Sequence, residues 1–355
     1  MPFPSTDELY TTAKRVLQKV HRAIEVQINR RPERALSYMQ ADDKEASNQP
    51  LRIDELAEDT CNEALLEKFG KYMIALGEES LGVPEAKDLA QQDSVVAVMD
   101  MIDGTDLLLR GLGNWCSAMT LFVPKKRQIL LAMVLDPAGT VFHANNVQSE
   151  AFYQRRNAKH PVSLHVSHAE TELTKSRVRF HRGFLSGPRA TTLRNASVCC
   201  NSQKASALSR FLKQPRLHKQ IATAVKTGQT KRKDQAPAPT FRHYNLSGIP
   251  MMVKLATGAV DAVIELGSQK PHDVVTGAYI AIKAGAIMKT IRGKIIGEEE
   301  LVDGLLQPGS RFDPYVLASC SELADELLEA LKPVARAVRA VAASDGPEPL
   351  PIRGS

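Results

Sequence analysis

The chain has 355 residues, of which 43% are hydrophobic and 24% charged, as is typical of a soluble protein with a sizeable core. It contains no apolar run long enough to cross a membrane, so we expect no membrane partner. Its net charge of +6 would suit a protein that binds anions, but aromatic residues at 5% are too few for base-stacking surfaces, which argues against a nucleic-acid polymer as partner.

The N-terminal segment is predicted to form an amphipathic helix that ends near Arg31. Ser5 to Glu8 form a capping box, and apolar residues then recur on one helix face. That face consists of Leu9, Ala13, Val16, Leu17, Val20 and Ile24. Because this pattern belongs to the fold and not to a signal peptide, we expect a cytoplasmic protein. The five cysteines show no metal-ligand spacing, which favours reduced thiols that pack in the core.

A second helix is expected over 53–68, with a buried side formed by Leu56, Cys61, Ala64, Leu65 and Phe69. Strands that we interpret as an antiparallel series follow at 72–76, 95–99, 117–123, 129–135 and 141–144. After residue 167 the two patterns alternate, with a strand at 177–181, helices at 205–212 and 247–256, a strand at 260–266, a helix from 273, a strand at 315–319 and a helix at 322–341. We therefore predict an α/β protein with an α+β domain at 1–167, an α/β domain at 168–345 and a disordered tail at 346–355.

Two carboxylates lie where the predicted strand at 95–99 ends. Asp100 and Asp103 are followed directly by Gly104 and Thr105. Neighbouring carboxylates repel each other unless they share a cation, and Mg²⁺ prefers oxygen ligands and leaves positions open for water and phosphate. The N–H groups of Gly104 and Thr105 lie at an expected helix start, where anions bind. A turn at Asp103 and a helix cap at Asp100 would explain the same residues, so this motif alone leaves both interpretations open.

Two further segments favour the metal site. Gly77-Glu78-Glu79-Ser80 lies upstream, and His272-Asp273-Val274-Val275-Thr276-Gly277 opens a helix downstream. Taken together and in this order, the three motifs resemble those of the inositol monophosphatase family, the Mg²⁺-dependent, lithium-sensitive sugar phosphatases. The resemblance covers about residues 53 to 332. It implies a layered αβαβα sandwich of the inositol monophosphatase and fructose-1,6-bisphosphatase type, with the active site between the two halves.

The resemblance implies which residues bind metal. Glu78, Asp100 and the carbonyl of Ile102 would hold one ion. Asp100, Asp103 and Asp273 would hold another, with two or three Mg²⁺ in all. Each of these carboxylates lies at a predicted strand end or helix start, so they can converge although they are far apart in the sequence.

The resemblance also implies catalytic and substrate-binding residues. Thr105, polarised by Asp59, would orient the attacking water together with Glu78. The substrate contacts that it implies are Gly104, Thr105, Asp103, Ser247 and Glu265. Asp59 is equally explained as a helix-surface charge, and Ser247 as the cap of the helix that follows.

The implied function is a Mg²⁺-dependent phosphomonoesterase that hydrolyses an inositol phosphate-like or sugar phosphate substrate, is inhibited by lithium and acts as a homodimer. Met101, His272 and Thr276 depart from the family pattern, and the spacing from Glu265 to Asp273 is one residue longer than usual. A non-catalytic phosphate-binding relative therefore remains an alternative. So do fructose-1,6-bisphosphatase-like activity and a 3′(2′),5′-bisphosphate nucleotidase, because the basic residues between 226 and 233 suit a substrate with several charges.

Overall fold

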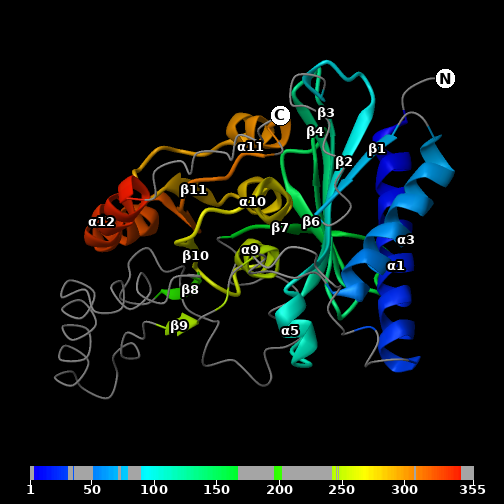
Figure 1. Cartoon of the computed structure of the whole chain (residues 1–355), viewed down its shortest axis with the longest axis horizontal. Helices are drawn as coiled ribbons and strands as arrows, with labels where there is room; N and C mark the ends of the chain where they lie inside the picture. The colour runs from blue at the N-terminus through cyan, green and yellow to red at the C-terminus, as the bar shows by residue number, and fades with distance from the viewer. Residues whose placement is uncertain are drawn as a thin grey trace, which may run out of the picture.

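The computed structural model describes residues 4–30, 35, 51–70, 73–78, 89–166, 196–201, 242–244, 246, 248–307 and 309–344. Within them two β-sheets alternate with helices in five layers (Figure 1). The helices are α1 (Thr6–Arg30) and α3 (Arg52–Phe69) in the first layer, α9 (Ile249–Ala256), α10 (Pro271–Lys283) and α11 (Glu298–Leu306) between the sheets, and α12 (Ser321–Ser344) in the last. This order confirms the predicted αβαβα sandwich.

The first sheet has seven strands that are neighbours in chain order. They are β1 (Met73–Gly77), β2 (Val95–Asp103), β3 (Cys116–Val123), β4 (Gln128–Leu135), β5 (Val141–Asn145), β6 (Ala151–Gln154) and β7 (Val162–Leu164). From β2 to β5 the pairing is antiparallel as predicted, and it stays antiparallel through β6 and β7, two strands that were not predicted. In contrast, β1 pairs with β2 in parallel, so the prediction of an antiparallel series is wrong at this pair. Hydrophobic patterning carries no strand direction, and the connection at 78–94 is long enough for the crossover that a parallel pair needs.

Helices α1 and α3 cover one face of this sheet (Figure 1). The cap of α1 is the predicted one, because Ser5 Oγ accepts the N–H of Glu8 at 3.2 Å, and its predicted apolar face is buried throughout. On α3 the buried face differs from the predicted one. Leu56 is only partly buried, whereas the carboxylate residues Asp54 and Glu58 are buried. The sheet-facing side of α3 therefore carries charge into the interior.

The second sheet has the strand order β11-β12-β10-β8-β9. Its strands are β8 (Ser197–Asn201), β9 (Arg242–Tyr244), β10 (Ala262–Glu265), β11 (Ile287–Thr290) and β12 (Tyr315–Ala318). Helices α9 and α10 pack tightly between the sheets, since a Cβ added at Gly277 would lie 2.8 Å from the sulfur of Met252. This contact holds the middle of α10 closely against α9.

Several predictions fall outside the described residues: the strand at 177–181, the helix at 205–212, the boundary between domains at 167, the basic residues at 226–233 and the tail. The five cysteines are buried thiols that form no disulfides, as expected of packing residues. No described helix combines the length and the apolar character that a membrane span requires.

Candidate functional site

The end of β2 is shaped by an irregularity in its pairing with β3. Asp100 pairs with Ala118, but the register shifts before Asp103 pairs with Cys116. Inside the resulting bulge Asp100 Oδ1 accepts the N–H of Ile102 at 3.0 Å, and Asp100 is 5% exposed. The bulge changes the direction of the backbone between Asp100 and Asp103, the two carboxylate residues at the end of the strand.

Asp103 connects the first sheet to helix α9. Its Oδ2 accepts the N–H of Ile249 at 2.5 Å, in the first turn of that helix. Gly248 precedes this turn with φ +82° and ψ −176°, a conformation essentially restricted to glycine, and an added Cβ would lie 2.8 Å from Asp103 Oδ2. The Asp103 carboxylate therefore occupies the space that a side chain at Gly248 would fill.

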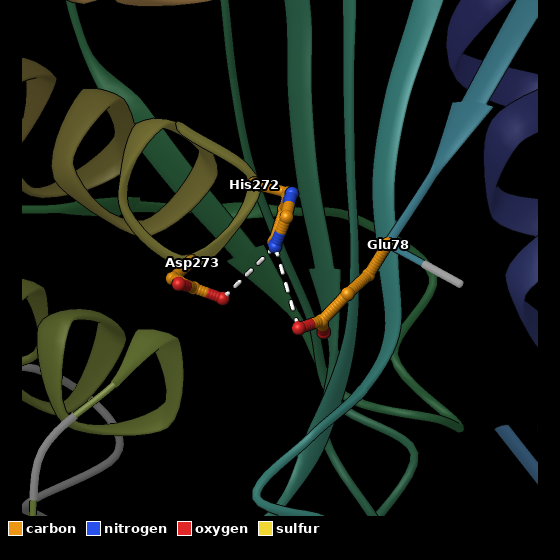
Figure 2. A group of neighbouring side chains, drawn as sticks. All are labelled: Glu78, His272 and Asp273. Atoms are coloured by element: carbon orange, nitrogen blue, oxygen red, sulfur yellow. Dashed lines mark ion pairs between the residues drawn. The ribbon is translucent and has the colours of Figure 1, made fainter. Parts of the chain in front are cut away.

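Glu78, His272 and Asp273 converge from two elements. Figure 2 shows Glu78 at the end of β1 and the other two side chains in the first turn of α10, all pointing toward one another. His272 Nε2 lies 3.4 Å from Glu78 Oε1 and 3.4 Å from Asp273 Oδ1. Burial raises the pKa of Glu78, but the positive charges of His272 and Lys270 lower it by more. Among the described residues these three side chains form a group whose ligand atoms all lie within 4.8 Å of one another.

Asp273 also has a role in the helix itself. Helix α10 begins at Pro271, two residues before its predicted start, and Asp273 Oδ2 accepts the N–H of Lys270 at 3.1 Å. This bond satisfies a free donor at the helix N-terminus and leaves Oδ1 available. Asp273 therefore caps its own helix with one carboxylate oxygen and does not use both of them.

The carboxylates strongly destabilise one another's charged forms. Burial raises the pKa of Asp100 well above its usual value, and the charges of Glu78, Asp103 and Asp273 raise it further. Burial and the charge of Asp273 raise the pKa of Asp103 in the same way, against the opposing effect of its bond to Ile249. Burial also raises the pKa of Asp273. A cation would stabilise the ionised forms of Asp100, Asp103 and Asp273, and the oxygens of the four acids suit a hard divalent ion.

Thr105 begins the short helix α5 (Thr105–Leu109) beside these acids. Its Oγ1 lies 3.1 Å from Asp54 Oδ1 and 2.8 Å from the carbonyl oxygen of Ile102. The predicted partner, Asp59, is exposed on α3, so the pairing of Thr105 with Asp59 is corrected to Asp54. Five residues along a helix turn a side chain through about 140°, which is why both residues cannot face the same site.

Asp54 is held from both sides and strongly perturbed. Its Oδ2 accepts the N–H of Leu51 at 2.8 Å. Burial raises its pKa to about 6, although its bonds to Leu51 and Thr105 act in the opposite direction. A second buried acid, Glu58, lies one helical turn further on, and a Cβ at Gly77 would meet its carboxylate oxygen at 2.1 Å. Sequence reasoning missed both residues, although their spacing of four would have placed them on one helix face.

The remaining predicted substrate contacts are Glu265, Ser247 and Gly104. Glu265 is 1% exposed at the end of β10, and its Oε1 accepts the N–H of Gly267 at 3.1 Å. Ser247 lies outside the described residues. Gly104 has φ +95°, and an added Cβ would lie 3.0 Å from the carbonyl oxygen of Asn114, so this position needs glycine to bring the backbone of α5 against the next loop.

Comparisons with known proteins concern the family and the fold. The chain matches the inositol monophosphatase family over residues 5–340. Its structure is similar to an IMPase of Thermotoga maritima, with a TM-score of 0.62 at 15% identity over 94% of this chain and 99% of that chain. It is also similar to the extragenic suppressor protein SuhB of Bartonella henselae, with a TM-score of 0.60 at 15% identity over 91% and 98% of the two chains.

A third similar structure is inositol monophosphatase II of Staphylococcus aureus, with a TM-score of 0.57 at 16% identity over 96% of this chain and 99% of that chain. No curated protein matches the chain in sequence. The match to the family model extends over nearly the whole chain and includes every candidate carboxylate. The chain therefore belongs to the inositol monophosphatase family.

Proposed function

We propose that this phosphatase-family protein hydrolyses a small phosphorylated alcohol with the help of divalent cations, Mg²⁺ foremost. One observation carries the proposal: Glu78, Asp100, Asp103 and Asp273 come from three distant segments and raise the free energy of one another's ionised forms. A fold gains no stability from this arrangement alone, because unpaired buried charge is costly. A cation removes that cost and supplies the chemistry.

The same carboxylates are the proposed ligands. Glu78, Asp100 and the carbonyl oxygen of Ile102 would hold one ion, and Asp103 and Asp273 would hold a second together with Asp100. Bound cations of this kind lower the pKa of a coordinated water and stabilise the charge that develops on the leaving oxygen. The bonds of Asp103 to Ile249 and of Asp273 to Lys270 each occupy one oxygen and thereby fix the direction of the other.

Thr105 is the proposed residue for orienting the attacking water. Its hydroxyl can donate to Asp54 Oδ1, which leaves the lone pairs of Oγ1 free to accept a proton from water. Asp54 thus acts as a positioning residue behind Thr105, in the role first expected of Asp59. The backbone N–H groups of Gly104 and Thr105 would bind the phosphate, and Glu265 and Ser247 remain proposed contacts for the alcohol.

The substrate class is proposed from the relatives. Solved structures of similar fold, all below 20% identity to this chain, hold inositol monophosphate or 2′-AMP in a Staphylococcus aureus enzyme, and NADP with Ca²⁺ in an IMPase/NADP phosphatase. Both an inositol phosphate and a phosphorylated nucleotide are therefore candidates. We further propose that the protein acts as a cytoplasmic homodimer, and light scattering of the purified protein tests its mass in solution.

The experiment that tests the proposal is phosphate release from a panel of phosphomonoesters, with Mg²⁺ or with EDTA. The panel contains inositol 1-phosphate, fructose 1,6-bisphosphate, 2′-AMP and a 3′,5′-bisphosphate nucleotide. We expect Mg²⁺-dependent turnover of at least one compound, and a faster rate for the bisphosphate nucleotide would favour the nucleotidase alternative. Mg²⁺ binding without release from any compound would favour the non-catalytic phosphate-binding alternative.

A further inference from the structure

His272 places a nitrogen atom directly among the carboxylates. It occupies the second position of α10, between Pro271 and the proposed ligand Asp273. Its side chain is 12% exposed, and the buried Nε2 makes no hydrogen bond of good geometry in the described part of the chain; its nearest acceptors are the carboxylates of Glu78 and Asp273, at ion-pair distance. In a neutral ring the lone pair of Nε2 would face these two carboxylates, an arrangement that a bound cation would relieve.

The spacing of the three side chains suits ligands of one ion better than it suits hydrogen bonds. Nε2 lies 3.4 Å from Glu78 Oε1 and 3.4 Å from Asp273 Oδ1, whereas N–H···O bonds are most often about 2.9–3.0 Å long. Two ligand atoms bound at about 2.0–2.2 Å to a cation lie about 3.0–3.5 Å apart at ligand angles between about 90° and 110°. Figure 2 shows that all three side chains point toward a common centre.

The ammonium group of Lys270 lies near this centre, but its side chain can turn away. Lys270 Nζ lies 3.9 Å from Glu78 Oε1, and its side chain is 39% exposed. A long and partly exposed lysine side chain can turn toward solvent when a metal ion binds. His272 and Asp273, in contrast, are held by the first turn of α10, which packs against α9.

We propose that His272 is a nitrogen ligand of the cation held by Glu78 and Asp273, and that it shifts the preference of this site from Mg²⁺ toward transition metals such as Zn²⁺. Imidazole nitrogen suits Zn²⁺ and other transition metals, whereas Mg²⁺ prefers oxygen. The inference rests on the proposed function only in taking Glu78 and Asp273 as cation ligands. It is therefore tested by metal binding rather than by turnover.

The test is calorimetric titration of the whole protein with Zn²⁺ and with Mg²⁺, in the wild type and in His272→Gln. Most carboxylate sites bind Zn²⁺ more tightly than Mg²⁺, so the informative quantity is the change in the ratio of the two affinities. Glutamine can offer an oxygen in place of the nitrogen. We expect His272→Gln to weaken Zn²⁺ binding by at least about tenfold and to leave Mg²⁺ binding within about threefold.

A matched control is His143→Gln. His143 is also buried with unpartnered ring nitrogens in the described chain, but it packs between the rings of Tyr10 and Phe152 on the side of the sheet that α1 covers. We expect no change in the affinity ratio for this variant. An unchanged ratio in His272→Gln, or an equal loss of both metals, would overturn the proposal.

A second measurement does not depend on the variant folding. Pulsed electron paramagnetic resonance of the wild type with one equivalent of Mn²⁺ should show hyperfine coupling to a directly bound imidazole nitrogen, and its absence would count against the ligand. A shifted Zn²⁺ to Mg²⁺ ratio in a protein that hydrolyses no phosphomonoester with either metal would support the His272 ligand and contradict the proposed function. Turnover of a phosphomonoester together with an unchanged Zn²⁺ to Mg²⁺ affinity ratio in His272→Gln would support the proposed function and contradict the His272 ligand.

Discussion

Replacing Asp54 with asparagine separates the stability of the fold from its proposed chemistry. The side chain keeps its shape, but one of the two oxygens that accept from Thr105 and Leu51 becomes an amide donor. If the remaining oxygen stays with the N–H of Leu51, the amide donates to Thr105 Oγ1. The hydroxyl proton of Thr105 then turns to the carbonyl of Ile102, 2.8 Å away, and Thr105 loses the acceptor that polarises it.

The magnitude follows from the pKa of Asp54. Burial raises that pKa from 3.8 to about 6, so the folded protein binds the proton more tightly than the unfolded chain. Asp54 therefore destabilises the metal-free fold progressively as pH rises from about 4 to 6, and by about 3 kcal/mol at neutral pH, at about 1.4 kcal/mol per pKa unit. Asparagine removes this cost, and the stabilisation of the charged form by the bonds to Leu51 and Thr105 is already included in the raised pKa. The variant should therefore be more stable than the wild type at neutral pH.

We therefore expect Asp54→Asn to raise the free energy of unfolding at pH 7.5 by up to about 3 kcal/mol, while phosphate release falls by about 10²–10⁴-fold. Urea unfolding in EDTA and a phosphate-release assay measure the two quantities. Asp59→Asn is the matched control, since this exposed residue on the same helix should leave both unchanged. Activity that is lost in Asp59→Asn and retained in Asp54→Asn would refute the assignment.

Three other predictions concern the site and the fold. Gly248→Ala should cost about 1–3 kcal/mol of backbone strain and also displace the Asp103 carboxylate, which abolishes metal binding. Gly293→Ala, at φ +88° with open space around it, should cost stability alone. Equal metal affinity of the two variants in calorimetry would contradict this prediction. Burial lowers the pKa of both His21 and His143 to about 4. The free energy of unfolding should therefore be highest above pH 6.5 and fall by up to about 3 kcal/mol per histidine toward pH 4. His143→Phe should remove about half of that fall in urea titrations, and an unchanged pH dependence would be the contrary result. Lithium chloride should inhibit turnover in the presence of Mg²⁺, and a rate that equal concentrations of NaCl and LiCl leave the same would speak against this.

The sequence predicted what is local and missed what depends on distant contacts. Asp100 and Asp103 stand out because they directly follow an apolar run, although β2 extends beyond that run to Asp103, and Asp273 because it lies in the first turn of a helix. The bond from Thr105 to Asp54 joins residues 51 positions apart, so hydrophobic periodicity alone could not reveal it. Helical spacing would still have favoured Asp54 over Asp59, because Asp54 lies between the buried residues of α3 while Asp59 lies on the exposed side.

The direction of strand β1 could not be predicted from the sequence pattern either. The segment at 73–77 has the same hydrophobic pattern whether it runs parallel or antiparallel to β2. Its direction matters for the site, because a parallel β1 ends beside the end of β2 and delivers Glu78 next to Asp100. Glu78 directly follows Gly77, which pairs with Met99, and Asp100 directly follows Met99, so the parallel pairing places the two acids at neighbouring positions.

The most direct test of a cation-dependent phosphatase site is a metal titration that follows phosphate release by the wild type and by Asp100→Asn. Asp100 is the most deeply buried of the four acids and is perturbed by the other three. We predict that EDTA-treated wild-type protein is inactive and regains turnover with added Mg²⁺, and that Asp100→Asn stays folded but regains none. Turnover in EDTA, or full activity of Asp100→Asn, would contradict the account.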